Sequence, residues 1–282
     1  MGKFSEILEK AEASKGKTLT GLAGDTCAER PDNKIDVHSP CRNPPQTVDS
    51  PSGQSTGKID PRLVTLLEPS TSAAECFKIL RSKLLYCGNG KTCRTIMVSS
   101  AQPHDGKTLV AANLAVSIAR GLDEHVLLVD CDFRRSMLHQ TFGLEIHRGL
   151  REYLENGNSV APYLQPTPVE KLTLLPAGER PANPSELLSS GKMRKLIEEL
   201  KARYQDRYVI IDTPPVQFTA EGNSLASMVD GVLLVVRSGK TSKELVFQAA
   251  ENIGRDRILG VVFNGGNGSR KYSRRYYGFG SS

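Results

Sequence analysis

Gly106, Lys107 and Thr108 stand in a row where phosphate chemistry could use all three residues. Backbone N–H groups of such a turn and the positive end of the helix that follows can hold phosphate oxygens. A lysine at this place reaches the terminal phosphates, and a threonine hydroxyl reaches magnesium. We therefore expect the chain to bind a nucleoside triphosphate with Mg²⁺. The expected nucleotide-binding residues of this loop are Pro103, His104, Asp105, Gly106, Lys107, Thr108 and Leu109.

The loop departs from the usual pattern G-x-x-x-x-G-K-[ST] at its first position, where this chain has Ala101. Taken alone, Gly-Lys-Thr is also compatible with the start of a helix that carries a solvated lysine. The choice between the two interpretations depends on what the rest of the chain supplies.

Two apolar segments end in aspartate. Residues 125–132 read HVLLVDCD and carry Asp130 and Asp132, and residues 208–215 read YVIIDTPP and carry Asp212. Ligands of open α/β sheets bind outside the carboxyl ends of the strands, so these carboxylates should face the same crevice as the loop. A single aspartate after a strand is usually a cap or turn residue. Three signals in the correct order favour a magnesium site instead, with Thr108, Asp132 and Asp212 as metal ligands.

Strand-like and helix-like segments alternate around these residues. The pattern predicts an α/β fold, a mainly parallel sheet with helices on both faces. Strands are expected near residues 95–99, 125–130, 172–175, 208–212, 231–236 and 258–263, and helices at 72–86, 107–120, 184–203 and 241–253. Phe77, Ile79, Leu80, Leu84 and Leu85 should form the apolar side of the first of these helices.

Composition is typical of a soluble globular protein, with 38% hydrophobic and 24% charged residues. No run of about 18 apolar residues and no secretory signal pattern occurs, so we expect no membrane span and a cytoplasmic location. The six cysteines lack C-x-x-C spacing and are expected to be reduced thiols. We expect an amphipathic helix at 1–14, a disordered linker at 15–69, a nucleotide-binding domain at 70–265 and a flexible tail at 266–282.

Three of the eight tyrosines, Tyr272, Tyr276 and Tyr277, lie in the tail behind a glycine-rich stretch at 265–268. Alone, this tail could be a solvated basic end or a contact for nucleic acid, since arginine and tyrosine suit phosphates and bases. The net charge of +6 is mild and argues against nucleic acid. Beside a triphosphate site, phosphate-accepting tyrosines explain the tail better.

These segments together resemble the bacterial tyrosine kinases (BY-kinases) of capsular and exopolysaccharide export. The resemblance covers about residues 70–280. The amino-terminal helix and the ending RRYYG further resemble the exosortase-associated autokinase subgroup. The segments that carry the resemblance are Ser99-Ser100-x-x-Pro103-x-x-Gly106-Lys107-Thr108, Asp130-x-Asp132-x-Arg134, Ile211-Asp212-Thr213-Pro214-Pro215, Pro176-Ala177-Gly178 with Pro184-x-Glu186-Leu187-Leu188, and DGVLLVVR at 230–237.

The resemblance implies a P-loop NTPase fold of the deviant Walker A type that uses ATP and Mg²⁺. It implies Lys107, Asp130 and Asp132 as catalytic residues, with Asp130 orienting or deprotonating the tyrosine hydroxyl, and Asn264 near adenine. Asn264 is also an ordinary turn residue before two glycines. The resemblance further implies a homo-oligomer with autophosphorylation in trans. An integral membrane polysaccharide co-polymerase, or chain-length regulator, would act as activator and hold the protein at the inner face of the membrane.

Two features leave alternatives open. The family pattern E-x-x-R-x-x-R, tied to self-association, is Glu75-x-x-Lys78-x-x-Arg81 here, and lysine lacks the planar fork of arginine. The chief alternative is an ATPase switch of the division-site or plasmid-partition kind, but those proteins usually carry a second lysine where Gln102 stands. A non-catalytic nucleotide-binding regulator of an exporter is the third interpretation.

Overall fold

The computed structural model describes residues 57–85, 93–203, 207–218 and 221–266, and the structural statements below concern these residues. The expected helix at 1–14, most of the expected linker, and the tail with its three tyrosines lie outside them. None of the described helices combines the length and the apolar character that crossing a bilayer demands.

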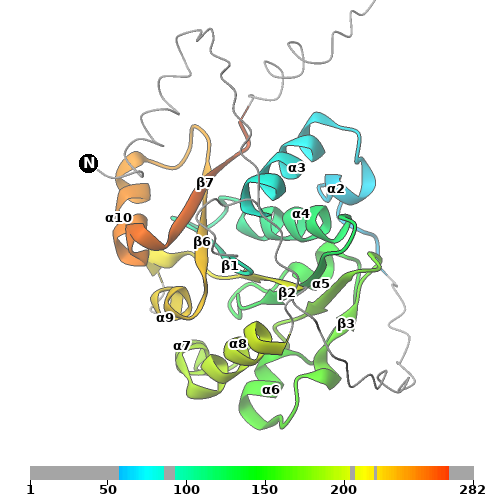
Figure 1. Ribbon diagram of the computed structural model, residues 1–282. Coiled ribbons are helices and arrows are strands. Elements are labelled where there is room, and N and C mark those ends of the chain that lie inside the picture. Colours follow the sequence, from blue (N-terminus) through cyan, green and yellow to red (C-terminus); the bar gives the residue numbers. More distant parts are fainter. Residues whose placement is uncertain (1–56, 86–92, 204–206, 219–220, 267–282) are drawn as a thin grey trace, which may run out of the picture. The chain divides into compact units, whose positions relative to one another are not determined.

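Seven strands form one sheet in the order β3-β4-β2-β5-β1-β6-β7 (Figure 1). Neighbouring strands are parallel, except that β3 pairs antiparallel with β4. The six strands expected from apolar runs are all present, whereas the edge strand β3 was not predicted. The strands are β1 (Thr95–Ser100), β2 (His125–Asp130), β3 (Gln165–Pro166), β4 (Leu172–Leu175), β5 (Arg207–Asp212), β6 (Gly231–Arg237) and β7 (Ile258–Asn264).

Helices lie on both faces of the sheet, as predicted: α2, α3 and α4 group on one side, and α7 and α8 on the other (Figure 1). The α-helices are α2 (Val64–Leu67), α3 (Ser72–Leu85), α4 (Lys107–Ala119), α5 (Leu138–Thr141), α6 (Leu150–Asn156), α7 (Pro184–Ser189), α8 (Gly191–Arg203), α9 (Glu221–Met228) and α10 (Lys243–Ile253). Short 3₁₀ turns occur at Ala161–Tyr163, Val216–Phe218 and Arg255–Arg257.

The helix expected at 184–203 is two helices in the structure. Ser190 has φ −66° and ψ 154°, which is extended backbone and interrupts the helical hydrogen bonds. Its Oγ accepts a hydrogen bond from the backbone N–H of Met193 (3.1 Å), so Ser190 caps the start of α8. The prediction of one helix was wrong because hydrophobic periodicity does not reveal a capping residue between two consecutive helices.

The apolar side predicted for α3 also needs a correction. Ala74 and Leu84 are buried, and Phe77 and Leu80 pack against the core, but Ile79 is 51% exposed. Phe77, Leu80 and Leu84 are spaced three and four residues apart and share one face of the helix. Ile79 is not in that series, so it lies off this face.

The folded unit begins earlier than residue 70, the start expected from sequence. Leu63 is fully buried, and α2 follows it directly. The backbone N–H and hydroxyl of Thr65 both donate to Oδ1 of Asn113 on α4, at 3.0 and 2.9 Å. Asn113 in turn donates to the carbonyl of Arg62 (3.1 Å). Residues 57–69 therefore belong to the domain, because a buried amide of α4 ties them to it.

Candidate nucleotide and metal site

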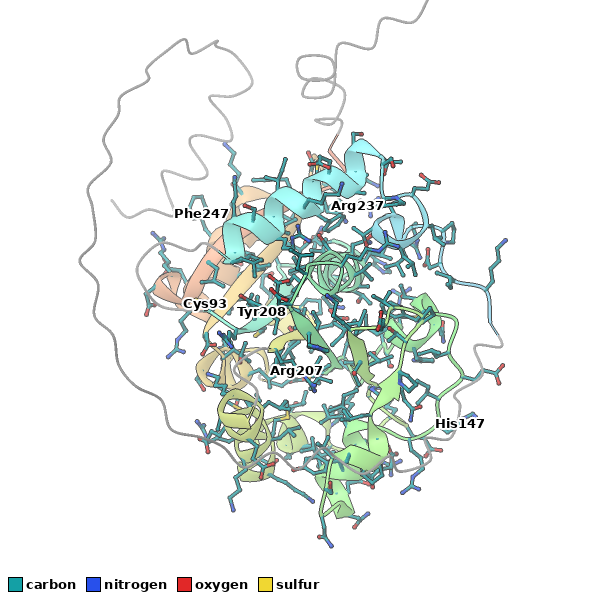
Figure 2. The ribbon with its side chains drawn as sticks, turned by 45° about the vertical axis from the view of Figure 1, so that its right-hand side comes forward. Cys93, His147, Arg207, Tyr208, Arg237 and Phe247 are labelled. Carbon is teal, nitrogen blue, oxygen red and sulfur yellow. The ribbon has the colours of Figure 1, made fainter. Side chains whose placement is uncertain are left out.

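The sheet brings the predicted carboxylates to one edge. Asp130 ends β2 and Asp212 ends β5, and the two residues are register partners in these neighbouring parallel strands. The Gly-Lys-Thr turn follows β1, which is the next strand beyond β5. Figure 2 labels Arg237 at this carboxyl edge and Arg207 and Tyr208 at the opposite, amino edge of the sheet.

Gly106 forms the turn that begins α4, with φ +92°. This backbone conformation is open to glycine and costly for other residues. A Cβ on Gly106 would also overlap Nδ2 of Asn264, which ends β7. Two features therefore favour glycine at this position, its dihedral angle and the close approach of the Asn264 side chain.

The buried carboxylate of Asp105 braces the loop. The hydroxyl of Thr241 donates to its Oδ1 (2.7 Å), and Nδ2 of Asn264 donates to its backbone carbonyl (2.8 Å). The backbone N–H of Gln102 donates to Oδ2 of Asp105 at 3.4 Å. The turn after β6 and the end of β7 thus hold the loop in shape. Asn264 was expected near adenine; the structure shows it bound to the loop backbone, and an adenine contact stays a prediction.

His104 has φ +68°, the only positive φ outside glycine among the described residues. Two arginines hold it there. Nη1 of Arg237 donates to the His104 carbonyl (3.1 Å), and Nη1 of Arg135 lies 3.2 Å from Nδ1 of its ring. A backbone held in a sparsely populated region is typical of ligand-binding loops.

Lys107 points into the carboxylate cluster. Its Nζ lies 2.7 Å from Oδ2 of Asp132, and the two side chains are 12% and 4% exposed. Burial alone would lower the pKa of Lys107, but the charges of Asp212 and Asp132 outweigh burial and raise it. Lys107 therefore stays charged and ready for an anionic ligand.

Burial has the opposite effect on Asp130 and Asp212, because it raises the pKa of a carboxyl group. Burial, and after it the charge of Asp212, raises the pKa of Asp130 to about 7, against a hydrogen bond from Ser136 that lowers it. Burial also raises the pKa of Asp212, against the charge of Lys107. One lysine does not neutralise three buried carboxylates, so this cluster favours an additional cation.

The residues fit a magnesium ion. Oδ1 of Asp212 is buried and accepts no hydrogen bond within the described part of the chain. A hydrogen bond from Thr108 reaches the same carboxyl group. Carboxylate and hydroxyl oxygens are ligands that Mg²⁺ accepts beside phosphate and water. Among the described residues, no group of three or more His, Cys, Asp and Glu side chains is arranged to hold a metal by itself.

Cys131 lies between Asp130, the last residue of β2, and Asp132, and it is fully buried. Burial, and after it the charge of Asp130, raises the pKa of this thiol well above its ordinary value. Cys76 and Cys131 are free thiols.

Sequence reasoning missed Glu221, which is fully buried at the start of α9. Its Oε1 lies 3.2 Å from Nη2 of Arg134, and the hydroxyl of Ser185 on α7 donates to its Oε2 (2.8 Å). Glu221 thereby ties Arg134, two residues after Asp132, to α9 and α7. No local pattern marks this glutamate, since its partners lie 87 and 36 residues away along the chain.

The fold and this site define a P-loop nucleotide-binding protein. A family model described as an AAA domain matches residues 93–255. The tyrosine-protein kinase YwqD of Bacillus subtilis is 34% identical over 223 residues, which are 78% of this chain and 93% of YwqD. The tyrosine-protein kinase ptk of Acinetobacter johnsonii is 34% identical over 68% of this chain, but the match spans only 26% of that longer protein.

A solved structure agrees with these relatives. The kinase domain of the Escherichia coli tyrosine kinase ETK superimposes with a TM-score of 0.68 and 31% identity, covering 74% of this chain and 81% of that domain. The chain therefore belongs to the bacterial tyrosine-protein kinases.

Gly106→Ala should weaken ATP binding at least about tenfold, since the added Cβ strains the turn and displaces Asn264 from Asp105. Gly239→Ala is the matched control. Gly239 also has a positive φ, of +72°, but its Cβ would meet nothing within 4 Å. Titration calorimetry with ATP and Mg²⁺ measures both affinities, and equal losses in the two variants would contradict the steric argument.

Proposed function

We propose that this protein is an ATP-dependent tyrosine autokinase that phosphorylates Tyr272, Tyr276 and Tyr277 of its own tail. The observation that carries the proposal is the buried cluster of Lys107 with Asp130, Asp132 and Asp212 beside the phosphate loop, in a chain of the tyrosine-kinase family. Phosphoryl transfer needs mainly positioning and charge neutralisation, and this cluster supplies both.

Each residue of the cluster has a separate task in this proposal. Lys107 and the N–H groups of the loop hold the phosphates of ATP. Thr108, Asp132 and Asp212 hold Mg²⁺, which neutralises phosphate charge when bound. Asp130 accepts the proton of the tyrosine hydroxyl, a task suited to a carboxyl group whose pKa burial raises to about 7.

The partners follow from the resemblance and are part of the proposal. An integral membrane co-polymerase of polysaccharide export would activate the kinase, and the process served would be exopolysaccharide or capsule assembly. Transfer between copies would need a homo-oligomer. On α3, Nζ of Lys78 pairs with Glu75 (2.9 Å), and Nη1 of Arg81 donates to the carbonyl of Ser117 (2.7 Å). An oligomer that uses Lys78 and Arg81 must break these contacts within one copy and replace them with contacts between copies.

Labelled ATP tests the proposal. Full-length protein should incorporate phosphate on tyrosine, and the triple variant Tyr272→Phe, Tyr276→Phe, Tyr277→Phe should lose at least about 99% of the label while keeping ATP affinity. The phenyl ring keeps the shape of the tail but has no oxygen to accept phosphate. Mass spectrometry identifies the modified residues.

Two outcomes would contradict the proposal. Label that persists in the triple variant places the acceptor elsewhere. ATP hydrolysis without any tyrosine label, also after membranes containing the co-polymerase are added, favours the partition-type ATPase instead.

A further inference from the structure

The first described segment of the chain, Gly57–Asp60, lies against the end of α5. The N–H of Gly57 donates to the carbonyl of Gly143 (3.1 Å), and the N–H of Asp60 donates to the carbonyl of Thr141 (3.1 Å). The approach is close, because a Cβ on Gly143 would overlap the carbonyl oxygen of Gly57. Two backbone hydrogen bonds and a glycine–glycine contact therefore fasten this segment to α5.

The other end of α5 reaches Asp130. The hydroxyl of Ser136, just before the helix, donates to Oδ2 of Asp130 (2.8 Å). The N–H of Leu138, the first helical residue, lies 3.4 Å from the same oxygen. Oδ1 accepts from the N–H of Asp132 (3.0 Å). The orientation of the Asp130 carboxylate thus depends on where α5 stands.

Between these ends, α5 is held tightly. The N–H and the hydroxyl of Thr141 both donate to the carbonyl of Met137, at 3.0 Å each. Leu138 and Phe142 are fully buried in the main core. Close-packed interiors transmit a displacement because they contain little free volume to absorb it. A displacement of the backbone at Thr141 and Gly143 should therefore also move Ser136.

We propose that the segment Gly57–Asp60 positions the Asp130 carboxylate, acting through α5 and Ser136. The inference rests on the proposed role of Asp130 in phosphoryl transfer. Residues 1–56 precede Gly57 in the chain, so a force on them could act on the Asp130 carboxylate through this segment. A ligand that pulls on this part of the chain would change the rate of transfer and leave the nucleotide site intact.

Gly57→Leu is the first test. A Cβ on Gly57 would come within 3.1 to 3.3 Å of the Gly143 backbone, so a leucine pushes the segment off α5. Lys58→Leu is the matched control, since it adds the same side chain at the next, exposed residue. Gly57→Leu should lower kcat for tyrosine phosphorylation at least about fivefold with KM for ATP unchanged, and Lys58→Leu should match the wild type.

Ser136 supplies the second test. Ser136→Ala should lower kcat about tenfold at unchanged KM, and Ser136→Thr, which keeps the hydroxyl, should restore most of the rate. The double variant Gly57→Leu, Ser136→Ala should be no slower than Ser136→Ala alone, because both changes act on one path. If the loss of kcat in the double variant equals the product of the two single losses, the two changes act independently. That result would overturn the link between Gly57 and Ser136.

Amide hydrogen exchange gives a readout that needs no transfer activity. Peptides covering residues 136–143 should exchange faster in Gly57→Leu than in Lys58→Leu. Unchanged exchange, or equal kcat in the two leucine variants, overturns the inference. A wild type that transfers no phosphate defeats the proposed function instead, and the exchange experiment still decides whether the segment holds α5.

Discussion

Lys107→Met should abolish tyrosine phosphorylation, with a loss of about 10³-fold or more in kcat/KM. Methionine has nearly the length of lysine but no charge to stabilise the phosphates as transfer proceeds. Nζ of Lys107 pairs with Asp132, and the charge of Asp212 also acts on it, so its positive charge lies within the carboxylate cluster. Transfer is measured as labelled phosphate on tyrosine against ATP concentration.

Lys240→Met is the control for this change, because Lys240 is an exposed lysine in the turn after β6. It should keep wild-type kinetics. Thermal unfolding should accompany the assay, since removing Lys107 leaves Asp132 without its cation. Tyrosine phosphorylation by Lys107→Met within tenfold of the wild type would contradict the role given to this lysine.

Asp130→Asn should stabilise the metal-free protein at about pH 8 and still remove most of the transfer activity. Burial raises the pKa of Asp130 from 3.8 to about 7 in the folded protein. The stability contributed by such a group is complete below about pH 4 and is lost as the pH rises through about 7. At higher pH the folded protein carries a buried charge that asparagine removes.

The expected gain for Asp130→Asn is on the order of 2–4 kcal/mol at about pH 8, shrinking to near zero toward pH 4. Urea unfolding with a chelator measures it, and Asp123→Asn, at an exposed aspartate, should show no such pH dependence. Losing the proton acceptor should lower kcat by about 10²-fold to 10⁴-fold. A pH-independent gain would contradict burial of the charge as its cause.

The sequence was sufficient to place the candidate site residues on one edge of the sheet. Each apolar run that ends in Asp130 or Asp212 is a parallel strand, and parallel strands put their carboxyl ends on one edge. Lys107 and Thr108 reach the same place because the loop connects a strand to a helix. Local composition and the rules of α/β topology are enough for this part of the site.

The supports of the site could not be predicted in this way. Thr241 and Asn264 hold Asp105 across 136 and 159 residues of sequence, and Glu221 holds Arg134 across 87. Such pairs are set by how strands and helices pack, and a single sequence contains no periodic signal of them. The same holds for the edge strand β3, whose two residues, Gln165 and Pro166, are too few to form a pattern.

The sealed thiol of Cys131 has a practical consequence. Oxidants and alkylating reagents attack the thiolate of an accessible cysteine, and Cys131 is neither ionised nor reachable in the folded domain. Cys76, exposed on α3, is the described cysteine that such reagents meet first. A fluorophore coupled at that helix would therefore test the proposed assembly between copies without modifying the thiol that lies between Asp130 and Asp132.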